Sequence, residues 1–145
     1  MAQNRLNINT DLYSKFLETS LAIVGITKQG ILEIRFKFDE YEVDVSDQEE
    51  LQKVVAQLTE NGKNRFHILV VPGKYGSITK EARNKEMFHS DTFSNYKSIS
   101  IVVVSIPQRI FAKFYYNIKK HKPNFPFQLF ATEELALKWI SDNNS

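Results

Sequence analysis

The chain has 145 residues, of which 42% are hydrophobic and 25% are charged, and its formal net charge is +2. This composition is typical of one globular domain, and so small a net charge gives no reason to expect nucleic-acid binding. Because the sequence contains no cysteine, disulfides, thiolate catalysis and zinc–thiolate sites are excluded.

The first nineteen residues are polar and weakly patterned. They lack the basic start and long apolar core of a signal peptide, and no apolar run in the chain approaches the roughly 20 residues that span a bilayer. We therefore expect a cytoplasmic protein without a membrane span. Residues 1–19 are expected to form a loose arm, or a short helix over Asp11–Leu17, in front of a domain at residues 20–145.

Two strands joined by a tight turn open the expected domain. Residues 20–27 are mostly apolar, and Gly30 in the turn that follows can adopt a positive φ. From residue 31 to 38 apolar and charged side chains alternate, and this period of two is typical of a half-buried strand. We therefore predict a β-hairpin over residues 20–38. The charged residues of its second strand are Glu33, Arg35 and Lys37.

The first helix is expected after this hairpin. Ser46 and Glu49 have the spacing of a capping box, in which each side chain bonds a free backbone N–H of the first turn. Apolar residues then recur at i, i+3, i+4 and i+7 from Leu51 to Leu58, which predicts one buried helical stripe. Asn61-Gly62 is expected to end the helix, because both residues tolerate left-handed backbone.

Two further segments are predicted to be central strands. Phe66–Val71 and Ile99–Ser105 are too apolar and β-branched for a surface strand, so both faces must be covered, as in a parallel sheet. We expect these two strands to be neighbours. Between them, Pro72–Gly76 is expected to be a loop, and Thr79 is expected to be the N-cap of a helix over Lys80–Ser90.

The C-terminal third adds a helix opened by Pro107, a short strand at Phe127–Phe130 and an amphipathic helix at Thr132–Ile140. In that last helix we expect Trp139 to be largely buried against the sheet. Strands that alternate with helices imply right-handed crossovers. The fold class is therefore α/β, with a mostly parallel five-stranded sheet, an N-terminal β-hairpin and about four helices.

Several segments together carry a family resemblance over about residues 20–141. They are Gly30-Ile-Leu32, Glu49–Leu58, Gly62-Lys63, Thr79-Lys-Glu-Ala-Arg83, Pro123-Asn-Phe-Pro-Phe-Gln-Leu-Phe130 and Ala136-Leu-Lys-Trp139. The chain resembles the STAS-like (SpoIIAA-like) group of small bacterial proteins of unknown function, which share the fold of anti-sigma factor antagonists. The resemblance implies a STAS-like domain that acts in protein interaction or regulation, as a homodimer or with a protein partner, and not as an enzyme.

The family pattern departs from this chain at one loop. Anti-sigma factor antagonists carry a phosphorylatable serine in an Asp-Ser-Ser/Thr-Gly setting at the start of the second helix. Ser77 and Thr79 occupy about that place here, but the acidic residue and the following glycine are missing. We expect Thr79 to be a helix cap rather than a phosphorylation switch.

The candidate binding residues lie in two loops. In open α/β sheets, ligands bind where loops leave the carboxyl ends of the strands, and Pro72–Thr79 and Ser105–Pro107 are such loops. Each leads into a helix N-terminus, which attracts anions. Either their polar side chains converge on a phosphate or carboxylate, or they only cap, turn and contact solvent. The residues concerned are Lys74, Ser77, Thr79, Arg83, Ser105 and Arg109.

No motif in the sequence predicts catalysis, a metal or a cofactor. The three histidines are dispersed without metal-ligand spacing, and no serine has the surroundings of a nucleophile elbow. Aromatic residues crowd the helix expected after Pro107, so a small apolar ligand is an alternative to an anionic one. The acidic zone at residues 39–50 and the basic zone at residues 109–122 are either solvated faces or a complementary contact in a dimer.

Overall fold

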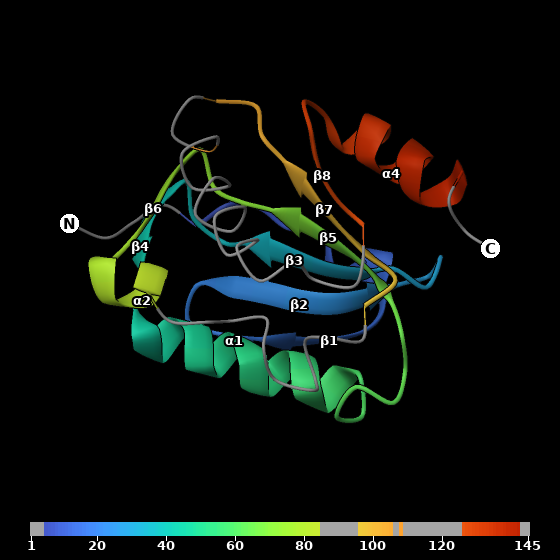
Figure 1. The fold of residues 1–145 in the computed structure, drawn as a ribbon, viewed down its shortest axis with the longest axis horizontal. Coiled ribbons are helices and arrows are strands. Elements are labelled where there is room, and N and C mark those ends of the chain that lie inside the picture. Colours follow the sequence, from blue (N-terminus) through green and yellow to red (C-terminus); the bar gives the residue numbers. More distant parts are fainter. Residues whose placement is uncertain (1–4, 85–95, 106–107, 109–125, 143–145) are drawn as a thin grey trace.

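The computed structural model describes residues 5–84, 96–105, 108 and 126–142. Its centre is a sheet of six strands with α1 on one face and α4 on the other, and a separate two-stranded sheet lies at one end (Figure 1). The strands are β1 (Tyr13–Glu18), β2 (Ala22–Thr27), β3 (Leu32–Phe36), β4 (Glu40–Val43), β5 (His67–Val71), β6 (Tyr75–Ile78), β7 (Ser98–Val102) and β8 (Phe127–Phe130). The helices are η1 (Thr10–Leu12, a 3-10 turn), α1 (Val45–Leu58), α2 (Lys80–Asn84) and α4 (Glu133–Asp142).

The large sheet is mixed, with the order β1-β2-β3-β5-β7-β8. β1 and β3 are antiparallel to β2, whereas β3, β5, β7 and β8 pair in parallel. The predicted hairpin and the predicted neighbourhood of β5 and β7 are confirmed. The sheet has six strands rather than five, because β1 was not expected.

The stretch expected as a loose arm contains the edge strand β1. The short helix considered over Asp11–Leu17 is wrong, because residues 13–18 pair with β2. Tyr13 is buried while Ser14, Lys15 and Phe16 are exposed, and the ladder shifts register between Tyr13 and Lys15. This exposure follows from the position at the sheet edge, where one side of the strand meets solvent.

The apolar stripe of α1 is confirmed, but its cap lies two residues earlier than expected. Asp44, not Ser46, is the N-cap: its carboxylate accepts from the N–H of Asp47 at 2.8 Å, and the Asp47 carboxylate accepts from the N–H of Asp44 at 3.0 Å. Asp serves in this position as well as Ser does. After α1, Asn61 and Gly62 have positive φ, as predicted.

Residues 72–76, expected as a loop, run into β6, which pairs in parallel with β4. The two glycines there do not have positive φ. They leave room for Tyr41: a Cβ on Gly73 would lie 2.6 Å from the Tyr41 ring, and one on Gly76 would lie 2.4 Å from it. The ring also stacks on Phe36 at 4.5 Å between centroids. Close approach, and not turn geometry, is what requires glycine here.

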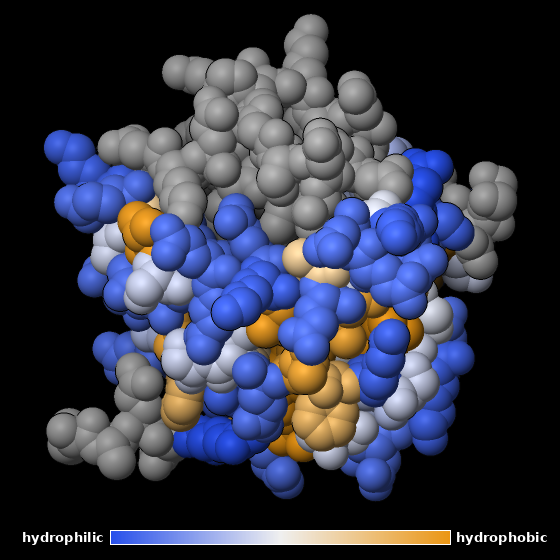
Figure 2. Space-filling model, turned by 90° about the horizontal axis from the view of Figure 1, so that it is seen from below, coloured by the Kyte–Doolittle hydropathy of each residue, from blue (hydrophilic) through white to orange (hydrophobic). Residues whose placement is uncertain are grey.

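Two hydrophobic cores cover opposite faces of the sheet. On the α1 face, Leu51, Val55 and Leu58 pack with alternate residues of the central strands. On the α4 face, Ala136 and Ile140 pack with residues such as Leu69 and Val102. Trp139 packs against this core and is mostly, though not completely, buried, as predicted; its ring contacts Phe130 at 5.5 Å between centroids. Seen from the side of α1, the surface is mostly hydrophilic, with an apolar strip across it (Figure 2).

Several expectations fall on residues outside the described part of the chain. These are the helix opened by Pro107, most of the helix over Lys80–Ser90, and the basic zone at residues 109–122. Within the described residues, no helix is long and apolar enough to cross a membrane.

Candidate functional site

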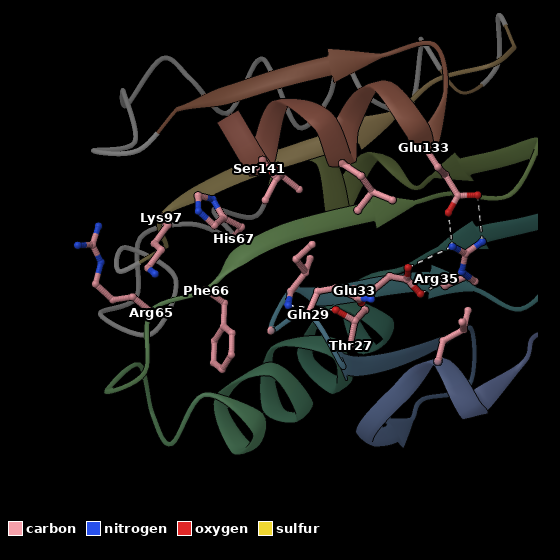
Figure 3. Close-up of a pocket in the computed structure, with 15 residues that line it drawn as sticks. Thr27, Gln29, Glu33, Arg35, Arg65, Phe66, His67, Lys97, Glu133 and Ser141 are labelled. Atoms are coloured by element: carbon pink, nitrogen blue, oxygen red, sulfur yellow. Dashed lines mark hydrogen bonds and ion pairs between the residues drawn. The ribbon is translucent and has the colours of Figure 1, made fainter. Parts of the chain in front are cut away.

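A groove of about 690 Å³ lies on the α4 face of the sheet (Figure 3). β3 and the start of β5 form its floor, α4 forms one wall, and Leu12 and the β2–β3 turn complete the lining. Small-molecule sites typically have volumes of roughly 300–1,000 Å³. The lining residues are Leu12, Thr27, Gln29, Gly30, Ile31, Glu33, Arg35, Arg65, Phe66, His67, Lys97, Glu133, Leu137, Ile140 and Ser141.

The groove exists because α4 covers only part of its face of the sheet. α4 contacts β5, β7 and β8, so the adjoining surface of β3 is left beside the helix. Leu137 on this side of α4 is 42% exposed. The β2–β3 turn closes one end, where the Thr27 hydroxyl accepts from the N–H of Ile31 at 3.1 Å and Gly30 has a φ of 84°.

Four side chains form a polar network that joins β1, β3 and α4. Glu33 accepts a hydrogen bond from the Tyr13 hydroxyl. It also accepts from Nε and Nη2 of Arg35, each 3.1 Å from a Glu33 oxygen. Arg35 in turn pairs with Glu133, the first residue of α4 (Figure 3). Glu33 and Arg35, expected on the polar side of a half-buried strand, are instead the inner part of a site; Glu33 is only 5% exposed.

Two members of the network, Tyr13 and Arg35, have raised pKa values. Burial, followed by the hydrogen bond to Glu33, raises the pKa of Tyr13 well above 10.0, so the hydroxyl remains a donor. Burial alone would lower the pKa of Arg35, but hydrogen bonds and charge interactions with Glu33 and Glu133 outweigh it and raise the pKa. These groups therefore stabilise one another as a structural ion cluster and hold the start of α4 on the sheet.

Two cations lie together at the other end of the groove. Nη2 of Arg65 donates to the carbonyl oxygen of Tyr96 at 3.4 Å, and the N–H of Lys97 donates to the carbonyl oxygen of Phe66 at 2.9 Å. These bonds set Arg65 beside Lys97, just before β5 and β7. Both side chains are exposed, and within the described residues neither has an ion-pair partner.

His67 also faces the groove, but its serine partner does not. Nδ1 of His67 lies 2.6 Å from Oγ of Ser98, across the β5–β7 pair. Ser98 is 1% exposed and does not line the groove, so its hydroxyl has no access to a molecule bound there. His89 and His121 lie outside the described residues, among which no group of three or more potential ligands could hold a metal ion.

A second cleft of about 570 Å³ borders the same ion pair. It is lined by residues of the N-terminal segment, including Leu6 and Ile8, together with Pro72. Arg35 and Glu133 line both clefts. The Arg35–Glu133 ion pair therefore lies between the groove and this second cleft.

The candidate residues predicted from the sequence lie at the opposite end of the strands. Thr79 is a cap, since its hydroxyl accepts from the N–H of Ala82 at 3.1 Å. The Ser77 hydroxyl donates to the carbonyl oxygen of Tyr41 at 3.3 Å. The Ser105 hydroxyl donates to the carbonyl oxygen of Lys74 at 3.0 Å and accepts from the N–H of Gln108 at 3.2 Å. The two loops thus meet, but these hydroxyls are engaged with backbone.

The side chains of the two arginines of that set lie outside the described part of the structure. Arg83 belongs to α2, and Arg109 lies outside the described residues. Lys74 is exposed, with Nζ 5.8 Å from the centroid of the Tyr75 ring. The structure therefore joins the two loops through Ser105 and Lys74.

Gln108 was missed by the sequence analysis, although it connects these loops. Its Oε1 accepts from the N–H of Val104 at 2.6 Å, and its Nε2 donates to the carbonyl oxygen of Pro72 at 2.9 Å. The side chain is buried. Its position three residues after Ser105, where the third residue of a helix bonds its cap, is the one signal that could have marked it.

Comparison with protein families matches residues 25–144 to a family described as a Domain of unknown function (DUF7793). No curated protein and no solved structure matches the chain. The family match covers most of the sequence, including β3, β5 and α4, which form the groove. The chain therefore belongs to this family, DUF7793, whose description states no activity.

Proposed function

We propose that the chain is a non-enzymatic binding protein of STAS-like (SpoIIAA-like) type, and that its groove holds a small ligand. The observation that carries this proposal is the groove itself, in which the charged side chains of Glu33 and Arg35 lie beside the exposed apolar side chain of Leu137. Small-ligand sites combine apolar walls with a few placed polar groups in this way. The N-terminal hairpin followed by parallel strands supports the STAS-like architecture, and the resemblance further suggests a bacterial protein.

Binding is favoured over catalysis by the state of the groove's polar groups. Glu33 is held between Tyr13 and Arg35, and Arg35 is held between two carboxylates. A general acid or base must be within reach of the substrate and must exchange a proton near the working pH. The raised pKa of Tyr13 and the ion pairs of Arg35 work against that exchange.

Native mass spectrometry of the purified protein tests the proposal, because it reports mass added by a retained ligand. We expect a small molecule to remain bound to the wild type and to be lost from Leu137→Asp, which places a charge at the exposed edge of the groove. Leu135→Asp is the matched control, since Leu135 is 50% exposed on the same helix but does not line the groove. Equal ligand retention by both variants would move the binding site elsewhere.

A second candidate function is the protein-interaction or regulatory role implied by the STAS resemblance. It is favoured by Tyr75 and Val104, large hydrophobic residues that are 54% and 62% exposed. Tyr75 is the first residue of β6 and follows Lys74, and Val104 precedes Ser105, whose hydroxyl bonds the carbonyl oxygen of Lys74. Exposed aromatic and aliphatic side chains mark interaction surfaces on many globular proteins.

The simplest partner for this surface is a second copy of the chain. Sedimentation velocity over a range of concentrations measures this association directly. We expect a dimer that Tyr75→Asp or Val104→Asp dissociates and that Phe16→Asp, on the exposed side of β1, leaves intact. A monomer at all concentrations would remove the homodimer from this second proposal.

A further inference from the structure

We infer that the groove selects a ligand with one anionic group and an apolar body, such as a medium-chain carboxylate. The inference rests on the proposed binding function and adds the chemical class and orientation of the ligand. The anionic group lies between Arg65 and Lys97 (Figure 3), and the apolar body runs along Ile31 and Leu137, which also line the groove.

The position of the anionic group follows from the distribution of charge. Arg65 and Lys97 are brought together by the bonds to Tyr96 and Phe66. Within the described part of the chain, neither is neutralised by a carboxylate. Two adjacent cations at the mouth of a cavity attract an anion and raise its local concentration.

The other end of the groove disfavours an anion. Glu33, Arg35 and Glu133 together carry a formal charge of about −1 when both carboxylates are ionised. The donors of Arg35 already face these two carboxylates. A ligand carboxylate would have to displace Glu133 there, whereas Arg65 and Lys97 accept it without such an exchange. The ligand therefore enters with one orientation.

The apolar body has a surface to cover between the two charged ends. Ile31 and Ile140 form the buried part of this surface, and Leu12 and Leu137 are the exposed part. An alkyl chain would remove the two exposed leucines from water, which is favourable in proportion to the apolar area covered. A hydrophilic anion such as inorganic phosphate gains nothing from this surface.

Titration with decanoate, followed by two-dimensional amide NMR on the full chain, tests the inference. Decanol, which has the same chain length without charge, and inorganic phosphate, which has charge without a chain, are the two comparison probes. We expect decanoate to bind more tightly than decanol by about fivefold or more at low salt, the effect of one close charge contact in water. Phosphate is expected to bind far more weakly than decanoate, and added salt should weaken the binding of decanoate.

Matched variants separate the two halves of the site. Lys97→Glu should weaken decanoate binding by roughly fivefold to tenfold and leave decanol binding unchanged, whereas Lys63→Glu, an exposed lysine outside the groove, should change neither. Leu137→Asp should weaken both probes, and Leu135→Asp should weaken neither. All four positions are exposed, so the variants are expected to fold.

The outcomes distinguish this inference from the proposed function. If decanol and decanoate bind equally and Lys97→Glu has no effect, the anionic class is wrong and the ligand-binding groove stands. If neither probe binds, the class is wrong, and native mass spectrometry decides the groove independently. Co-sedimentation with phosphatidylglycerol vesicles forms a further arm: binding to vesicles that depends on Lys97, without binding to decanoate, would assign the anion to a lipid headgroup and overturn the free amphiphile.

Discussion

At the scale of single residues, the side chain of Tyr41 leaves no room for a Cβ at either of two neighbouring glycines, Gly73 and Gly76. The Tyr41 hydroxyl accepts from the N–H of Gly73 at 2.9 Å, and the ring lies against Gly73 and Gly76. A Cβ on Gly73 would also lie 2.1 Å from the carbonyl oxygen of Phe38. A backbone oxygen cannot move aside as a flexible side chain can, so the constraint belongs to the main chain itself.

We therefore predict that Gly73→Ala lowers the free energy of unfolding by about 3 kcal/mol or more, at the upper end of the cost of overpacking. Gly30→Ala is the control. It meets no atom within 4 Å and carries only the penalty of a positive φ, of the order of 1 kcal/mol. Urea denaturation of both variants makes the comparison, and similar losses would show that the space near Tyr41 relaxes.

Thr79 and Ser77 differ in what a negative charge would do. Thr79 caps α2 through Ala82, so Thr79→Ala should cost about 1 kcal/mol and Thr79→Asp close to nothing. Ser77 lies opposite Glu42 in the β4–β6 ladder. Ser77→Asp should therefore destabilise by several tenths of a kcal/mol, as facing like charges do. Thermal denaturation measures these differences, and partner or dimer binding altered only by Thr79→Asp would favour a phosphorylation switch instead.

Glu50 should make stability depend on pH in the acid range. The N–H of Ser20, and then its hydroxyl, donate to Glu50 and lower its pKa below the ordinary 4.5. Because the folded-state pKa is the lower one, this stabilisation is present above about pH 4.5 and is lost as the pH falls through the folded-state value. The stability difference between wild type and Glu50→Gln should shrink on acidification. Glu134→Gln, an exposed carboxylate on α4, provides the control in urea titrations at neutral and acid pH.

At the scale of elements, α4 is held on the sheet at two places along its length. Its first residue, Glu133, pairs with Arg35, and its apolar side buries Ala136 and Ile140. The amide of Leu135 is capped by the Thr132 hydroxyl at 3.1 Å. The ion pair sets where the helix starts, while burial of the two apolar residues supplies most of the stabilisation, because half-exposed ion pairs contribute little.

Ile140 should accordingly matter more than Trp139. Ile140 is 3% exposed, so Ile140→Ala should cost about 2–5 kcal/mol. Trp139 is partly buried against Phe130, so Trp139→Ala should cost about 1–2 kcal/mol, below the usual 3–5 kcal/mol for a fully buried aromatic ring. Chemical denaturation of both variants tests the order, and a larger loss from Trp139→Ala would contradict this account of α4.

At the scale of the whole molecule, the central parallel strand β5 is covered by neighbouring strands at both edges and by a hydrophobic core on each face. β5 is hydrogen bonded to β3 and β7, and side chains of both cores cover its faces. β1 is paired with β2 alone and exposes most of its residues. Hydrogen exchange should therefore be slowest in β5 and much faster in β1. Equal protection of the two strands would indicate that β1 is covered in solution by a further element or a second chain.

The sequence predicted the elements whose signals are local. β5 and β7 are rich in β-branched residues, and α1 carries its stripe over two turns, so each was located to within a few residues. β1 was missed because Tyr13–Glu18 mixes polar and apolar residues without an alternating pattern. β6 was missed because glycine and proline around it are typical of turns, whereas here glycine makes room for Tyr41.

The groove could not be read from the sequence, because its parts are far apart along the chain. Glu33 and Glu133 come to the same Arg35 only after the sheet forms and α4 packs across it. Alternation in β3 identified which side chains share a face, but it could not say that a helix would cover part of that face. The candidate residues at the carboxyl ends were chosen by a rule about strand ends, while the larger described groove opens beside the amino ends of β5 and β7.

The position of Trp139 on α4 gives the molecule a built-in optical reporter. It is the only tryptophan of the chain, so intrinsic emission excited at the indole band arises from one ring on the helix that walls the groove. Because that ring rests partly buried on Phe130, any loosening of the helix from the sheet would shift its spectrum toward the red. The absence of native thiols allows an acceptor dye to be attached at one introduced cysteine across the groove. Any movement of α4 away from the sheet can thus be followed in real time, without substituting the α4 residues that pack against the sheet.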